Sequence, residues 1–142
     1  MEHYKAQNAA NLAQYEAERS RSLESFRSVI LTGQAALKSA ILINGGASVA
    51  LLAFLGHIWN TEPPAPVVAG LTQSLLFFLI GVLLSAMAAG TTYLTQAFYD
   101  GGWDKTGMGI NFINILLVVS AYYLYLKGGL AAYSTFVLHL GN

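Results

Sequence analysis

Three long stretches with few charged residues do most to limit what this chain can fold into: residues 39–59, 67–99 and 108–140. A helix needs about 20 residues to cross a hydrocarbon core of ~30 Å, and each stretch is long enough. In lipid, backbone polar groups need partners within the chain, which favours helices. Charged residues make up 10% of the chain, against about 25% in a soluble domain. The sequence therefore predicts an all-α membrane protein.

Loop signals separate the three stretches. The segment NTEPPAP (60–66) contains three prolines, and DGGWDKTG (100–107) contains a Gly-Gly pair flanked by acidic residues, so we expect a loop at each. The third stretch contains Gly128 and Gly129. A separate helix over 128–140 would be only about 20 Å long, too short to cross. We therefore expect three long transmembrane helices, and four helices with a short last one is the alternative.

Residues 1–38 form a distinct region, because they hold four of the seven acidic and five of the seven basic residues. The region is rich in good helix formers and has three Glu–Arg pairs at i,i+3 spacing, which support a helix. A stripe of small and apolar residues at spacings of three and four resembles an assembly seam: Leu23, Phe26, Ile30, Gly33 and Leu37. We expect an amphipathic cytoplasmic assembly helix at 1–38 and a transmembrane domain at 39–142.

The basic residues predict the orientation. Arg19, Arg21, Arg27 and Lys38 precede the first apolar stretch, Lys105 lies in the second loop, and the proline-rich loop has none. By the positive-inside rule, the N-terminus and the loop at 100–107 face the cytoplasm. The loop at 60–66 and, with three spans, the C-terminus then face the outside.

Polar and small residues inside the apolar stretches allow two interpretations. In the packing interpretation, Asn44 forms hydrogen bonds between helices, and patterns such as Gly46–Ala50 and Gly81–Ser85 let the helices approach closely. In the functional interpretation these residues line or gate a water path. The candidate pore or gate residues are Asn44, Gly45, Gly46, Ser48, Gly81, Ser85 and Lys127.

Lys127 also allows two placements. If the second and third helices pack antiparallel, with 67 level with 140, Lys127 lies near the level of Ile80 in mid-membrane. An ammonium there costs at least ~2.5–3.5 kcal/mol and marks a functional site by default. If the third span covers 108–126 instead, Lys127 extends to the outer interface.

No catalytic constellation, metal site or cofactor motif is visible, so we expect no enzyme and no cofactor. The cytoplasmic region offers a candidate sensing site for a partner protein or a nucleotide or oligonucleotide signal, because its cations suit phosphates and its nearby aromatic rings suit stacking. The candidate sensing residues are Arg19, Arg21, Arg27 and Lys38. Interleaved glutamates make a solvated, salt-bridged face the alternative.

The segments LKSAILINGGASVALLAFLGHIW (37–59) and FFLIGVLLSAMAAGTTYLTQAFY (77–99) carry a resemblance. Over about residues 25–99 the chain resembles a family of small bacterial multi-span membrane proteins with an Asn-Gly-Gly-Ala first span. That family has no described function and lends no functional residues.

The architecture is also similar to that of antiphage membrane effectors, which open the inner membrane when a partner senses infection. That likeness implies a homo-oligomeric pore or membrane-perturbing effector, gated through the cytoplasmic helix. It also implies a location in a bacterial inner membrane, with the N-terminus in the cytoplasm and the C-terminus in the periplasm. The alternatives are a non-conducting scaffold that anchors a soluble partner and a small-solute transporter, although the chain has no internal repeat of the kind transporters use.

Overall fold

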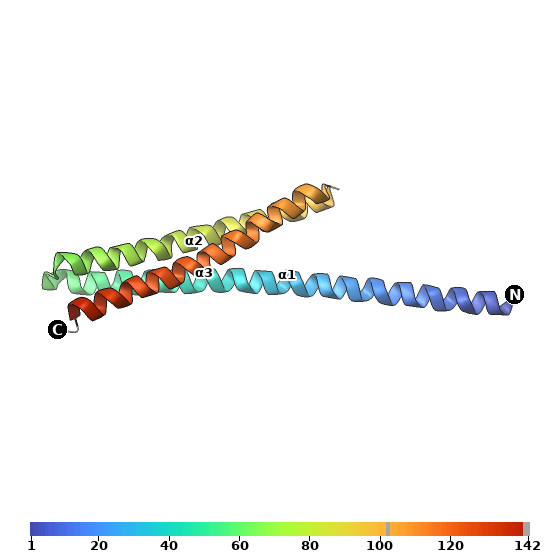
Figure 1. The fold of residues 1–142 in the computed structure, drawn as a ribbon, viewed down its shortest axis with the longest axis horizontal. Helices are drawn as coiled ribbons and strands as arrows, with labels where there is room; N and C mark the ends of the chain where they lie inside the picture. The colour runs from blue at the N-terminus through green and yellow to red at the C-terminus, as the bar shows by residue number, and fades with distance from the viewer. Residues whose placement is uncertain (102, 141–142) are drawn as a thin grey trace. The chain divides into compact units, whose positions relative to one another are not determined.

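The computed structural model, which describes residues 1–101 and 103–140, consists of three long helices and one short one (Figure 1). They are α1 (Glu2–Ile58), the 3₁₀ helix η1 (Trp59–Thr61), α2 (Ala65–Asp100) and α3 (Asp104–Leu140). Side chains are described throughout these ranges except at Glu2, Tyr99, Asp100, Asp104, His139 and Leu140. The three long helices are long and apolar enough to cross a membrane. The prediction of three such helices is confirmed.

The chain divides into two compact units, Met1–Ala35 and Ala36–Asn142. The first unit is the N-terminal part of α1, and its described side chains are exposed as far as Val29. The second unit holds the rest of α1 together with α2 and α3. Helix α1 has no break at the charged-to-apolar boundary near Lys38, since good helix formers continue on both sides.

A proline-rich turn connects α1 to α2. The Thr61 hydroxyl donates to the Ile58 carbonyl at 2.7 Å, and the amides of Val67 and Val68 donate to the Pro64 carbonyl at 2.9 and 3.3 Å. Pro66 lies in the first turn of α2, where a missing backbone N–H costs nothing. Helix α2 therefore begins two residues earlier than the expected start at 67.

The connection between α2 and α3 is shorter than the sequence predicts. The loop expected over 100–107 is limited to the residues between Asp100 and Asp104, because α3 already begins at Asp104. The Trp103 amide donates to the Phe98 carbonyl at 2.9 Å, and the Gly107 amide donates to the Trp103 carbonyl at 3.0 Å. These bonds close one helix and start the next, so five of the expected loop residues, Asp100 and residues 104–107, are helical.

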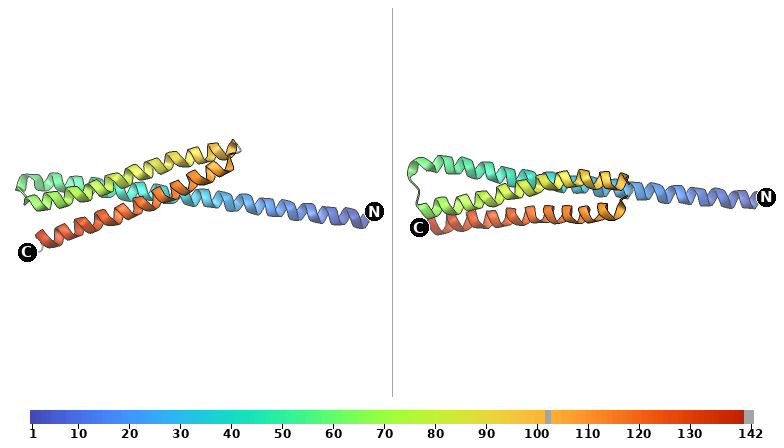
Figure 2. Two further views of the ribbon diagram at one scale, coloured as in Figure 1. Left: turned by 45° about the horizontal axis from the view of Figure 1, so that its top comes forward. Right: turned by 90° about the horizontal axis from the view of Figure 1, so that it is seen from above.

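Helices α2 and α3 form an antiparallel hairpin and lie side by side along their length (Figure 2). Thr135 lies against Gly70, and Asn114 bonds to Thr91 and Thr92 at the other end. Helix α3 continues through Gly128–Gly129 as one helix. The alternative of a separate short fourth helix is therefore wrong.

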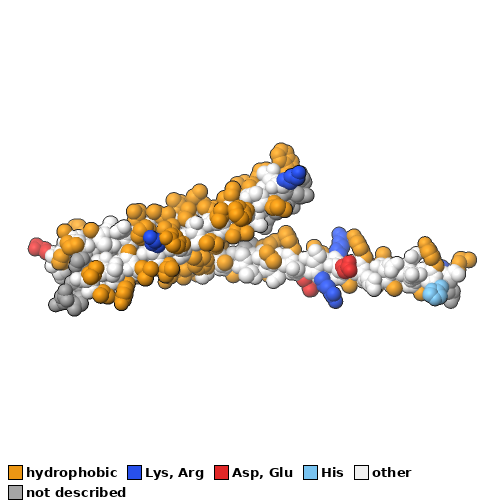
Figure 3. Space-filling view, viewed as in Figure 1, with side chains coloured by type: hydrophobic (Ala, Val, Ile, Leu, Met, Phe, Trp, Pro, Cys, Tyr) orange, Lys and Arg blue, Asp and Glu red, His pale blue; other side chains and the backbone are white. Residues whose placement is uncertain are grey.

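In the second unit, polar side chains are buried and many large apolar side chains are exposed, which is the reverse of the distribution in a soluble protein. Its buried polar residues are Asn44, Ser48, Ser74, Ser85, Thr95 and Thr135, whereas many leucines and tyrosines on α2 and α3 are exposed. Figure 3 shows hydrophobic side chains over much of the surface of this hairpin. In lipid, burying leucine between helices gives no hydrophobic stabilisation, and helices associate through small and polar residues instead. The distribution of side chains is therefore consistent with membrane insertion.

An apolar cluster closes one end of the bundle. Leu51, Val67, Leu71 and Phe78 are its buried members. Next to it, the rings of Phe54 and Phe136 meet edge to face with centroids 5.3 Å apart. This cluster fixes α1 against the N-terminal half of α2 and the C-terminal half of α3.

Candidate functional site

Asn44 lies at the junction of all three long helices. Its side chain is fully buried, and its Nδ2 donates to the Ala40 carbonyl at 2.9 Å and to the Ala121 carbonyl of α3 at 3.4 Å. Its Oδ1 is buried and accepts no hydrogen bond. The amide therefore ties α1 to α3 and turns its oxygen toward α2.

Gly81 of α2 makes room for that oxygen. A Cβ built on Gly81 would overlap Asn44 Oδ1 and lie 2.6 Å from its Cγ. The glycine Cα–H groups are thus the nearest donors on α2 that face the oxygen, and such weak Cα–H···O contacts recur at helix–helix interfaces. Among the candidate pore residues, the structure brings Asn44 and Gly81 together.

Ser48 and Ser85 lie one turn away on the same helices and are nearly or fully buried. The Ser48 hydroxyl donates to the Asn44 carbonyl and the Ser85 hydroxyl to the Gly81 carbonyl, each at 2.9 Å. Both hydroxyls are satisfied within their own helix. They act here as small residues at a close crossing, which is the packing interpretation.

Gly45 and Gly46 do not make the close contact expected of them. The nearest side-chain atom to a Cβ built on Gly45 is Val82 Cγ2 at 3.9 Å, and a Cβ on Gly46 has nothing within 4 Å. Close approach occurs at Gly81, Gly70 and Gly128 instead. Sequence alone does not reveal which glycine faces a neighbour, because that depends on the rotation of each helix about its axis.

A second polar layer lies toward the α2–α3 turn. Asn114 Nδ2 donates to Thr92 Oγ1 at 2.8 Å, and Thr91 Oγ1 donates to Asn114 Oδ1 at 3.2 Å. Both the nitrogen and the oxygen of the Asn114 amide are therefore hydrogen-bonded to α2. The layer holds the hairpin in register.

Lys127 lies on the opposite side of α3 from these contacts. Its side chain is exposed, and its Nζ lies 5.7 Å from the centre of the Tyr123 ring one turn earlier. The next residue, Gly128, is buried, and a Cβ built there would lie 2.7 Å from Phe78 Cε1. Lys127 is therefore level with the middle part of α2, close to the level of Ile80.

The candidate sensing residues are all exposed. Arg19, Arg21 and Arg27 belong to the first unit, and Lys38 lies just inside the second. The structure places no folded pocket around them within the first unit, which is a single helix over its described residues.

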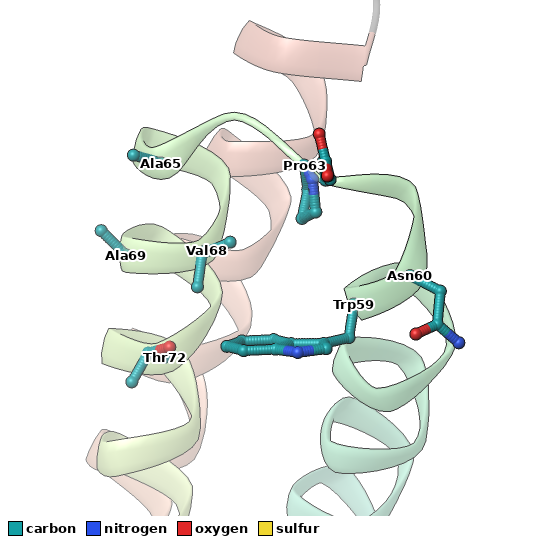
Figure 4. Close-up of a pocket in the computed structure, with 8 residues that line it drawn as sticks. Trp59, Asn60, Pro63, Ala65, Val68, Ala69 and Thr72 are labelled. Carbon is teal, nitrogen blue, oxygen red and sulfur yellow. The ribbon is translucent and has the colours of Figure 1, made fainter.

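A pocket that sequence reasoning missed lies where α1 gives way to α2 (Figure 4). Its lining residues are Trp59, Asn60, Glu62, Pro63, Ala65, Val68, Ala69 and Thr72. The prolines predicted a turn here. The sequence alone does not show that this turn and Trp59 enclose a pocket, because that depends on how the turn folds in three dimensions.

Among the side chains that the structure describes, no three His, Asp or Glu residues come close enough to hold a metal ion. No protein-family model, curated protein or solved structure matches the chain. The functional argument therefore rests on the geometry of the bundle.

Proposed function

We propose that the protein is a homo-oligomeric membrane pore in which the Lys127 face of α3 lines the conducting path. The observation that carries this proposal is an exposed lysine on α3, level with the middle part of α2, in a bundle of helices apolar enough to cross a membrane.

The packing of the hairpin supports a mid-membrane position for Lys127. The residue is eleven positions, or about 17 Å at ~1.5 Å per residue, from Leu138 in a helix that is long and apolar enough to cross a membrane. Phe54 of α1 packs against Phe136 of α3, so this end of α3 lies near the end of the first apolar stretch. This position well inside the helix supports the mid-membrane placement of Lys127 over the interfacial one.

The bundle offers this cation no counter-charge. The sequence has no Asp or Glu in 39–58, 65–98 or 105–138. An uncompensated ammonium facing lipid costs at least ~2.5–3.5 kcal/mol, and charged residues in membranes almost always face a bundle interior or a water-filled cavity. A ring of protomers that turns the Lys127 face inward removes that cost.

The surface around Lys127 suits such a path. Three residues with hydroxyl groups, Ser120, Tyr123 and Ser134, are exposed on α3. They lie seven, four and seven residues from Lys127, which puts them on the same side of the helix as Lys127. Their hydroxyls offer hydrogen-bonding groups along the helix. The buried Asn44 and Gly81 then serve as the rigid contact that holds the protomer together, not as the lining itself.

The N-terminal unit supplies the means of assembly. It exposes large apolar side chains that nothing within that unit covers, including Leu12, Tyr15, Leu23 and Phe26. A seam of such residues is typical of helices that pair with one another. We assign gating to this unit, through a cytoplasmic protein or a nucleotide signal that acts on its exposed arginines, and antiphage defence is the biological setting we propose.

The direct test is ion flux through the purified protein in liposomes, alone and with candidate signals, together with its mass in detergent. We expect an oligomer whose flux changes in Lys127→Met, whereas Leu126→Met, at an exposed neighbour that does not share the Lys127 face of α3, leaves the flux unchanged. An oligomer that stays silent under every condition contradicts the pore.

The second candidate is a non-conducting scaffold that anchors a soluble partner. The observation that favours it is that several polar side chains form their hydrogen bonds within one protomer and so support a tightly packed bundle. These residues are Asn44, Ser48, Ser85 and Asn114. A scaffold predicts a silent protein in which Lys127→Met has no effect other than on stability.

A further inference from the structure

The pocket at the α1–α2 turn has the size and the chemistry of a small binding site. Its volume is about 910 Å³, within the ~300–1,000 Å³ typical of such sites. In Figure 4 the ring of Trp59 extends from the end of α1 toward Val68 and Thr72 of α2, with Pro63 at the turn beyond it. The pocket is thus bounded by one aromatic ring, one turn and one helix wall.

Two of the lining residues suit a cation. Trp59 is 69% exposed, so its indole face is free to receive one, and tryptophan gives the strongest cation–π contacts. Glu62 is the sole acidic residue between Glu24 and Asp100, and it lines the same pocket. No basic residue lies among the lining residues to neutralise that carboxylate.

The backbone of Glu62 is held in an unusual conformation. It has φ 50° and ψ 58°, the left-handed region, and it directly precedes Pro63. Residues other than glycine pay about 1–2 kcal/mol for this conformation, and a following proline restricts them further. Glycine would be the ordinary residue at such a turn, so the presence of a strained glutamate suggests that its carboxylate is needed there.

The position of the pocket identifies the source of the cation. The α2 wall, formed by Val68, Ala69 and Thr72, continues into exposed apolar residues such as Leu76 and Leu83. The pocket therefore opens onto the surface that membrane insertion would place against acyl chains. A ligand with a cationic head and apolar chains fits both parts at once.

We propose that this pocket binds the headgroup of a phospholipid with a primary ammonium group, of the phosphatidylethanolamine class. The ammonium donates hydrogen bonds to the Glu62 carboxylate and lies against the Trp59 ring, and the acyl chains follow α2. A primary ammonium is preferred over a trimethylated one, because the latter has no N–H to donate to Glu62. Phosphatidylglycerol lacks the cation and binds more weakly.

The test uses Trp59 as its own reporter. Replacing Trp103 by Phe leaves Trp59 as the single tryptophan, since the chain has two. The protein is placed in bilayers that contain brominated phosphatidylethanolamine or brominated phosphatidylglycerol at equal mole fraction, and quenching of Trp59 is titrated. We expect phosphatidylethanolamine to quench at about tenfold lower mole fraction, as one charge-assisted hydrogen bond implies.

Glu62→Gln in the same background keeps the shape of the pocket and removes its charge, so it should abolish the preference. Glu24→Gln, an exposed glutamate outside the pocket, should keep it. Equal quenching by the two lipids in the parent protein, or a preference that survives Glu62→Gln, overturns the proposal. The inference requires membrane insertion but not conduction, so a silent pore leaves it intact.

Discussion

Asn44 of α1 and Gly81 of α2 are fitted to each other: the amide oxygen of the asparagine occupies the space that a side chain on residue 81 would fill. Replacing Gly81 by Ala should therefore force the two helices apart or push the amide away from the Ala121 carbonyl. We expect a loss of about 1–3 kcal/mol in the free energy of unfolding. Unfolding in mixed micelles measures this loss.

Gly46→Ala is the matched control, because a Cβ there meets nothing within 4 Å. It should be neutral or slightly stabilising, since alanine favours helix over glycine. Equal losses in the two variants would mean that residue 81 does not face Asn44.

The amide of Asn114 couples α3 to α2. A double-mutant cycle between Asn114→Leu and Thr92→Val should give a coupling energy of about 0.6 kcal/mol, the average for hydrogen bonds between helices in membranes. Thr95 donates only to the Thr91 carbonyl of its own helix, so Thr95→Val should show no coupling to Asn114. Coupling of the same size for both threonines would contradict a specific bond.

Lys127 should determine the sign of the conducted ion. A ring of ammonium groups with no carboxylate in the spanning segments attracts anions and repels cations. We expect an anion-selective reversal potential in a KCl gradient, lost in Lys127→Met and reversed in Lys127→Glu. A conducting protein whose reversal potential is the same in all three would show a path that avoids Lys127.

The apolar seam of the first unit should govern assembly. Phe26 and Leu23 are exposed and lie three residues apart on one helix face. Introducing a charge by Phe26→Glu should lower the mass of the protein in detergent, as measured by light scattering, while leaving its helix content unchanged. Leu31 is also exposed but lies off this seam, so Leu31→Glu should keep the parent mass.

Glu62→Gly should stabilise the protein, by about 0.5–1 kcal/mol, because the relief of the left-handed strain exceeds the extra entropy that glycine loses on folding. The same variant should lose the preference for phosphatidylethanolamine. Thermal unfolding and Trp59 quenching on one sample separate the two effects. A destabilised Glu62→Gly would show that the carboxylate has a structural partner in the turn.

Much of the architecture could be predicted because it depends on local properties. Helix length follows from apolar runs and prolines, and the antiparallel pairing of long hairpin helices puts Lys127 near the level of Ile80 from chain length alone. The observed contact of Gly128 with Phe78 agrees with that level. The assignment of Gly45 and Gly46 to close contact was less successful, because small residues recur on several faces and helix rotation is set by the whole bundle.

The turn at Pro63, Pro64 and Pro66 leaves the joint between α1 and α2 with few internal degrees of freedom. Each proline fixes its own φ, and Pro63 is restricted further by the proline that follows it. The backbone torsions that remain between η1 and α2 are φ and ψ of Glu62, which Pro63 restricts, and the ψ angles of Pro63 and Pro64. A ligand bound to the carboxylate of Glu62 therefore also restrains the turn that sets the angle between α1 and α2.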